Sequence, residues 1–129
     1  MATSIVSRNS DKSSSDRSLQ LALAAARTAA DNRGQDIQLL DVREMTQLFD
    51  YIVIASGTSR RQLHAISEEI DHTLEDDMDD KRMGIEGYRE SRWIILDYGS
   101  IVVHIFDAET REFYRLEELW GDAKKVEWE

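Results

Sequence analysis

Two groups of residues in this chain have the types and spacing that could do chemistry. Residues 56–59 (Ser-Gly-Thr-Ser) precede a predicted helix that carries Arg60 and Arg61, and backbone N–H groups at such a helix start can hold a phosphate. The turn has one glycine and lacks the Lys-Ser/Thr ending of a phosphate-binding loop. We therefore interpret it as a strand-to-helix turn, in which Ser59 and Gln62 form a capping box.

The second group consists of acids and histidines. The aspartates of residues 76–80 (DDMDD) have the oxygen ligands that hard cations prefer, but they lack the spacing of a calcium loop. His64, His72 and His104 do not have the spacing of a known metal motif. The sequence therefore predicts an acidic solvated surface here, with no metal site and no cofactor.

The most informative stretch is residues 93–106, WIILDYGSIVVHIF. Two apolar runs around Gly99-Ser100 predict a β-hairpin with a two-residue turn. The predicted register makes one face wholly apolar, which assigns that face to the core. The opposite face is mixed and is either covered by helices or kept for a partner; its residues pair as Trp93 with Phe106, Ile95 with His104, and Asp97 with Val102.

Asp97 and His104 lie diagonally across this mixed face, within reach of each other. Such a pair could orient a catalytic base, but no serine or cysteine nucleophile accompanies it in the local sequence. We expect a structural pair that keeps the surface rigid, and the sequence predicts no catalytic residues.

The remaining elements follow from hydrophobic periodicity and capping residues. A helix is predicted from an N-cap at Ser18 to a stop at Gly34, and strands are predicted at residues 37–42 and 49–55. A helix follows Ser59, and a short strand lies near residues 83–88. Asp107 caps a last helix whose core face is expected to carry Phe113, Leu116 and Trp120.

The order αββαβββα indicates a single α/β domain with a mixed sheet of about five strands and helices packed on it. We expect residues 1–17, which are Ser-rich, to be disordered, residues 18–120 to form the domain, and residues 121–129 to be a tail. The net charge of -10 opposes non-specific binding of nucleic acid and favours a basic partner. The absence of cysteine and of a membrane-spanning run predicts a cytoplasmic protein.

Three blocks of this sequence resemble the ribosomal silencing factor (Iojap-like) family. The first is residues 50–59 (DYIVIASGTS) with Gln62 and Ala65 after it, and the second comprises Gly84-x-x-Gly87 with residues 93–99 and 102–106. The third is the pattern Arg111-x-x-Tyr114-x-Leu116-Glu117-x-Leu119-Trp120. The resemblance covers about residues 18 to 120.

The resemblance implies a fold with nucleotidyltransferase-like topology that lacks catalysis. It also implies a factor that binds a basic large-subunit ribosomal protein, number fourteen, and blocks the joining of the subunits, so that translation is repressed when nutrients are scarce. Many members of this family form homodimers when free, so the resemblance also implies a homodimer for the free chain. The residues to which we assign partner contact are Tyr51, Trp93, Ile94, Ile95, Asp97, His104 and Glu117.

Two alternatives remain open at this point. One is a nucleotidyltransferase-fold enzyme that acts on nucleotides with Mg²⁺, which requires paired carboxylates near the residue 56–59 turn. Asp77 and Asp79 are the candidates, although they lie far along the chain. The other is a scaffold that binds some other basic protein.

Overall fold

The computed structural model describes the backbone of residues 2–129 and the side chains of residues 16–129. Its elements are α1 (Ala2–Asp31), β1 (Gln35–Asp41), β2 (Tyr51–Gly57), α2 (Arg60–His72), the π-helical turn η1 (Thr73–Asp77), β3 (Gly84–Glu86), β4 (Trp93–Asp97), β5 (Ile101–Asp107), α3 (Ala108–Tyr114), α4 (Leu116–Leu119) and β6 (Lys124–Lys125).

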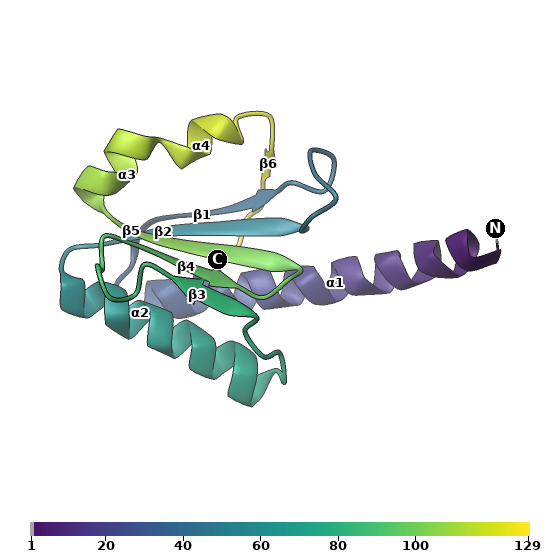
Figure 1. Cartoon of the computed structure of the whole chain (residues 1–129), viewed down its shortest axis with the longest axis horizontal. Helices are drawn as coiled ribbons and strands as arrows, with labels where there is room; N and C mark the ends of the chain where they lie inside the picture. Colours follow the sequence, from purple (N-terminus) through teal and green to yellow (C-terminus); the bar gives the residue numbers. More distant parts are fainter. Residues whose placement is uncertain (1) are drawn as a thin grey trace.

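The strands form one mixed sheet in the order β3-β4-β5-β2-β1-β6. Helices α1 and α2 lie on one face of this sheet, and α3 and α4 lie on the other (Figure 1). The predicted α/β class is confirmed, with six strands instead of about five.

Strand β2 is the centre of the sheet, and all its residues are buried. It pairs in parallel with β5, from Tyr51 opposite Ile101 to Gly57 opposite Asp107, and it pairs antiparallel with β1. A strand covered on both faces needs apolar residues at consecutive positions. The run from Tyr51 to Ala55 meets that need, and the predicted central strand is confirmed.

The predicted hairpin is also confirmed, residue by residue. Trp93 lies opposite Phe106 and Asp97 lies opposite Val102, and the amide of Tyr98 donates to the carbonyl of Ile101 at 3.0 Å. Gly99 has φ +84° at the first turn position, a conformation that glycine adopts without steric cost.

The apolar side chains form two clusters of unequal size. The larger lies between the sheet and α1 and α2, and it includes the apolar hairpin face. The smaller lies beneath α3 and α4 and contains Leu40, Val42, Ile52, Ile54 and Phe106.

Helix α1 does not begin at Ser18, as the sequence predicts. Ser18 is buried inside a helix whose bounds reach back to Ala2, and no glycine or proline interrupts the chain before Gly34. The prediction of disorder for residues 1–17 stays a prediction, because most of those residues have side chains outside the described part of the chain. The stop at Gly34 is confirmed, since its amide donates to the carbonyl of Ala29 at 2.8 Å and a Cβ atom there would clash with that carbonyl oxygen.

The last predicted helix is two helices. Asp107 caps α3 as expected, accepting from the amide of Thr110 at 2.7 Å, but Arg115 adopts a left-handed conformation with φ +47° and ends α3. The assignment of Phe113 to the core is therefore wrong, and its side chain is 79% exposed. Leu116 and Trp120 pack against the smaller cluster as predicted.

Residues 121–129 supply the sixth strand. Lys124 and Lys125 pair with β1, and the amide of Val126 donates to the carbonyl of Leu39 at 2.8 Å. Trp128 packs against the larger cluster, and its indole N–H donates to the carbonyl of Ile37 at 3.3 Å. This segment therefore covers the β1 edge.

A glycine between β3 and β4 generates the first prediction. Gly87 has φ +75°, and a Cβ atom there would lie 1.9 Å from the carbonyl oxygen of Trp93. Gly87→Ala should lower the free energy of unfolding by more than about 2 kcal/mol, as measured by urea denaturation.

The matched control is Gly84→Ala, because a Cβ atom at Gly84 would meet nothing within 4 Å. We expect a change within about 0.5 kcal/mol for this variant. Equal stability of the two variants would show that the Gly87 backbone imposes no such constraint.

Candidate functional site

The mixed face of the hairpin is only partly covered by helices. Helix α3 meets it through Tyr114, whose ring centroid is 4.9 Å from that of Trp93. Farther along the hairpin, Ile95 and Val102 are half-buried and Asp97 is exposed. Both alternatives given by the sequence thus hold for different parts of this face: one end is capped by the chain itself and the other is open.

Trp93 is held in one orientation by its neighbours. Its ring stacks on Phe106 with centroids 4.7 Å apart, and its indole N–H donates to Nδ1 of His104 at 3.0 Å. Trp93 is half-buried, so part of the residue stays accessible at the surface. An aromatic anchor that is already fixed loses little conformational entropy on binding.

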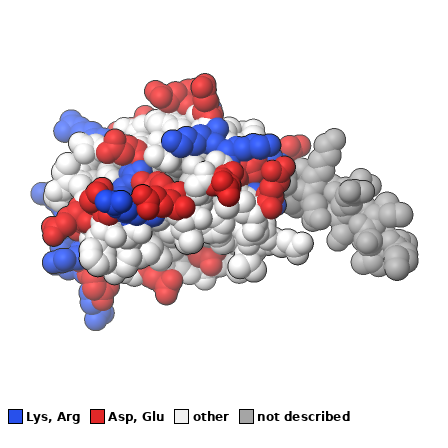
Figure 2. Space-filling model, turned by 90° about the horizontal axis from the view of Figure 1, so that it is seen from above, with Lys and Arg blue, Asp and Glu red and all other residues white. Residues whose placement is uncertain are grey.

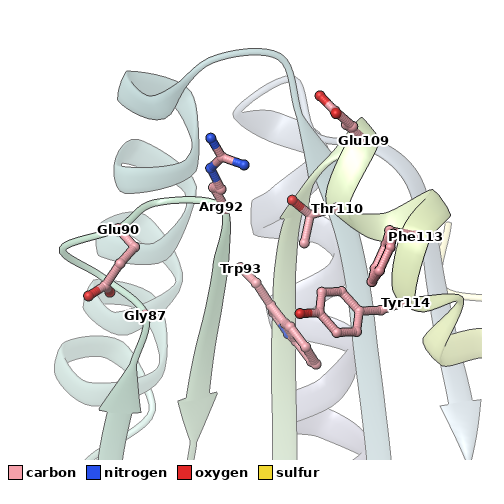
Figure 3. A pocket seen from close by; sticks show the side chains of 8 residues that line it. All are labelled: Gly87, Glu90, Arg92, Trp93, Glu109, Thr110, Phe113 and Tyr114. Atoms are coloured by element: carbon pink, nitrogen blue, oxygen red, sulfur yellow. The ribbon is translucent and has the colours of Figure 1, made fainter.

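A pocket of about 440 Å³ opens beside this indole, and we call it the aromatic pocket. Figure 3 shows the Trp93 and Tyr114 rings next to each other, with Phe113 on the same helix beside Tyr114. Phe113 and Tyr114 are both exposed although they are large and aromatic. The lining residues are Gly87, Glu90, Arg92, Trp93, Glu109, Thr110, Phe113 and Tyr114.

The predicted pair between His104 and Asp97 does not form. His104 is buried and its Nδ1 accepts from Trp93, so the ring is neutral with its proton on Nε2. Burial lowers the pKa of His104 to about 4. The Asp97 carboxylate instead accepts from the amide of Gly99 at 2.8 Å and braces the hairpin turn.

The other predicted contact residues occupy different environments. Tyr51 is 2% exposed and Ile94 is 0% exposed, and both belong to the larger cluster under α1 and α2. A partner could reach neither side chain without opening the fold, so surface contact is wrong for these two residues and for buried His104. Glu117 is half-buried and pairs with Arg111, whose Nε donates to Glu117 Oε2 at 2.9 Å.

Arg111 is a residue that sequence reasoning treats only as part of a motif. It is buried and connects two distant segments, because its Nη1 also donates to Ser56 Oγ at 2.7 Å. The predicted helix gave no signal for it, because Arg111 lies opposite the face that carries Phe113, Leu116 and Trp120. Its partner Ser56, 55 positions away, could not be found from spacing.

The turn at residues 56–59 is a strand-to-helix turn, as interpreted. Ser59 Oγ accepts from the amide of Gln62 at 3.1 Å, and Gln62 Oε1 accepts from the amide of Thr58 at 2.6 Å. The Gln62 side chain also donates to the carbonyl of Arg33 at 2.9 Å and ties α2 to the end of α1. These polar groups thus serve the fold.

The acids required for nucleotide transfer are not near this turn. Asp77 and Asp79 lie beyond the C-terminal end of α2, whereas the turn precedes its N-terminal end. Among the side chains that the structure describes, no group of three or more acids or histidines could hold a metal ion.

The charged residues are unevenly distributed on the side that carries α3 and α4. Figure 2 shows acidic and basic groups mixed in a band across this side, with an uncharged area next to it. Within the described residues, no helix is both long and apolar enough to cross a bilayer.

Comparison with known proteins decides the family. The family model described as "Ribosomal silencing factor during starvation" matches residues 15–129. The chain belongs to the ribosomal silencing factor family. The match includes residues 121–129 and so extends beyond the region of resemblance seen in the sequence.

Relatives of this silencing factor come from bacteria and from organelles. Ribosomal silencing factor RsfS of Bacillus subtilis is 42% identical over 100 residues, which cover 77% of this chain and 83% of that protein. The mouse protein named "Mitochondrial assembly of ribosomal large subunit protein 1" is 39% identical over 88 residues, 67% of this chain and 39% of the mouse protein. A crystal structure from Chromobacterium violaceum superposes with a TM-score of 0.77 at 30% identity, covering 84% of this chain and 89% of that one.

The buried histidine of this silencing factor makes folding stability depend on pH. The folded pKa of about 4 lies below the ordinary value of 6.5, so the unfolded chain binds the proton more tightly. The contribution of His104 is complete above pH 6.5 and is lost as the pH falls toward 4. Between pH 7.5 and pH 5, wild type should lose about 2 kcal/mol more stability than His104→Leu, measured by urea denaturation.

The control for this prediction is Val103→Ala, on the same strand as His104. Val103 is 0% exposed and has no titratable group, so its loss destabilises the fold at every pH. This variant should be less stable than wild type but retain its pH dependence. If His104→Leu retained it as well, the ring would not be the group responsible.

Proposed function

We propose that this chain binds a basic protein of the large ribosomal subunit, ribosomal protein number fourteen, and so prevents the small subunit from joining. Translation would then be repressed under nutrient limitation. The observation that carries the proposal is membership of the silencing factor family, combined with the open half-apolar face around Trp93. The role is one of steric obstruction and needs no catalytic group.

The contact surface we propose is centred on the aromatic pocket. Trp93 supplies a fixed anchor, Phe113 and Tyr114 supply exposed rings, and Ile95 and Asp97 continue the surface along β4. Aromatic residues are enriched among the side chains that dominate binding energy at interfaces. Exposed rings grouped at one site support a docking role for this end of the sheet.

Charge supports a basic partner. The chain has a net charge of -10, and Glu90 and Glu109 stand at the aromatic pocket with one cation, Arg92. Acidic groups around an apolar centre attract a cationic surface and orient it as it approaches. The same charge disfavours a grip on ribosomal RNA.

Substitution at the exposed ring of Phe113 is the cleanest test of this surface. Phe113→Ala should leave the free energy of unfolding unchanged, because the side chain is 79% exposed, but should weaken binding to isolated large subunits. Trp93→Ala should weaken it by about 2 kcal/mol or more, roughly thirtyfold in the dissociation constant. Affinity would be measured by co-sedimentation over a range of concentrations.

Leu48→Ala is the matched control. Leu48 is also large, apolar and exposed (81%), but it lies in the loop between β1 and β2, outside the proposed contact surface. Its loss should not change affinity. Undiminished binding by Phe113→Ala and Trp93→Ala would place the contact elsewhere on the molecule.

Ionic strength tests the electrostatic part of the proposal. The association rate with purified ribosomal protein fourteen should fall by about tenfold or more between low and high salt, while the dissociation rate changes little. Stopped-flow fluorescence of the tryptophans would give both rates. An association rate independent of salt would exclude steering by the acidic surface.

A further inference from the structure

The loop between β3 and β4 forms one wall of the aromatic pocket, and we call it the β3–β4 loop. It comprises residues 87–92, of which Gly87, Glu90 and Arg92 line the pocket. Figure 3 shows Gly87 and Glu90 on one side of the pocket and the residues of α3 on the other. A loop that belongs to a binding surface is best held in place beforehand, because ordering a mobile segment on binding costs affinity.

The backbone of the β3–β4 loop needs outside contacts to keep its conformation. Gly87 has φ +75° and Ser91 has φ +61°, so both are left-handed. The amide of Ser91 donates to the carbonyl of Gly87 at 2.9 Å and closes the loop on itself. A positive φ is unfavourable for serine, so the surrounding structure must stabilise it.

Helix α2 supplies these contacts from Arg60 and from His64 one turn later. Nη2 of Arg60 donates to the carbonyl of Arg89 at 2.7 Å, and its Nε donates to Ser91 Oγ at 3.2 Å. Nε2 of His64 lies 2.8 Å from the carbonyl oxygen of Tyr88 and 2.5 Å from Ser91 Oγ. Because a carbonyl oxygen can only accept, Nε2 carries a proton and donates to the loop.

A third residue of α2 extends this set of contacts. Glu68 accepts a hydrogen bond from the phenol of Tyr88, whose ring centroid lies 4.1 Å from that of His64. Arg60, His64 and Glu68 are spaced four residues apart and therefore share one side of the helix. We call these three residues the α2 stripe.

The α2 stripe determines the position of Glu90 in particular. The carbonyl of Arg92 accepts from the amide of Asp107 at 2.9 Å, so the neighbouring strand β5 already fixes Arg92. Glu90 is exposed and lies between Arg89 and Ser91, the two residues that Arg60 and His64 hold. Its place at the aromatic pocket therefore depends on contacts with α2.

We propose that Arg60 and His64 are positioning residues that hold Glu90 where it meets the basic partner, although both lie outside the aromatic pocket. This inference rests on the proposed function. A carboxylate on a fixed loop meets a cation with defined geometry, and little conformational entropy is lost. Helix α2, on the face of the sheet opposite α3, thus contributes to docking without touching the partner (Figure 1).

Hydrogen exchange in the free chain tests the hold on the loop. His64→Leu removes the N–H donor and keeps a side chain of comparable size, so the amide of Ser91 should exchange about tenfold faster. His64→Gln supplies an N–H group with similar reach and should restore slow exchange. Unchanged exchange in His64→Leu would overturn the proposal, whether or not the chain binds ribosomes.

Asp71→Leu is the matched control for exchange. Asp71 also joins α2 to the hairpin, since the phenol of Tyr98 donates to its Oδ1 at 2.9 Å, but it makes this contact away from the β3–β4 loop. The Ser91 amide should exchange at the wild-type rate in this variant. Equal acceleration by Asp71→Leu and His64→Leu would show a general loss of stability and overturn the proposal.

A double-mutant cycle, measured by co-sedimentation with large subunits, tests the link to docking. His64→Leu and Glu90→Gln should each weaken binding by about fivefold, and the double variant should bind no more weakly than Glu90→Gln alone. A residue that acted only on overall stability would weaken binding equally with and without the Glu90 carboxylate. Independent losses, or full binding by His64→Leu, would overturn this inference alone; no binding by wild type would overturn the proposed function as well.

Discussion

The parallel pairing of β2 with β5 is the constraint on which the rest of the structure depends. It places β2 between two other strands and buries it on both faces, so both sides of the sheet must be covered. The chain does so unequally. Long α1 and α2 cover one side, and short α3 and α4 cover part of the other (Figure 1).

This unequal cover leaves the aromatic pocket open beside α3. Because α3 is short and ends at Arg115, its last residues leave Phe113 and Tyr114 at the surface beside Trp93. On its other side the same helix carries Arg111 over the end of β2, where its Nη1 donates to Ser56 Oγ. A single short helix thus presents an aromatic surface, suited to a protein partner, and is tied by Arg111 to the central strand.

The sequence predicted the parts of this fold whose signals are local. The alternation around Gly99-Ser100 gave the hairpin register in full, and Ser59 and Asp107 marked two helix starts. It could not show that Arg115 would adopt a left-handed conformation and end α3, since left-handed backbone is uncommon for a residue other than glycine and the sequence carries no glycine there. Nor could it find the contact of Arg111 with Ser56 or the pairing of β6 with β1, which join segments far apart in the chain.

The candidate site was predicted in part. The sequence correctly placed Trp93, Ile95 and Asp97 on the mixed face of the hairpin. The predicted pair of Asp97 with His104 was wrong because the indole N–H of Trp93 donates to Nδ1 of His104.

Obstruction of subunit joining is tested most directly by sedimentation of purified ribosomal subunits. Small and large subunits would be mixed in conditions that join them, with and without this chain, and separated on a sucrose gradient. We predict that the chain moves with the large subunit and that free subunits replace joined ribosomes as its concentration rises. Undiminished formation of joined ribosomes with the chain bound to the large subunit would contradict the account.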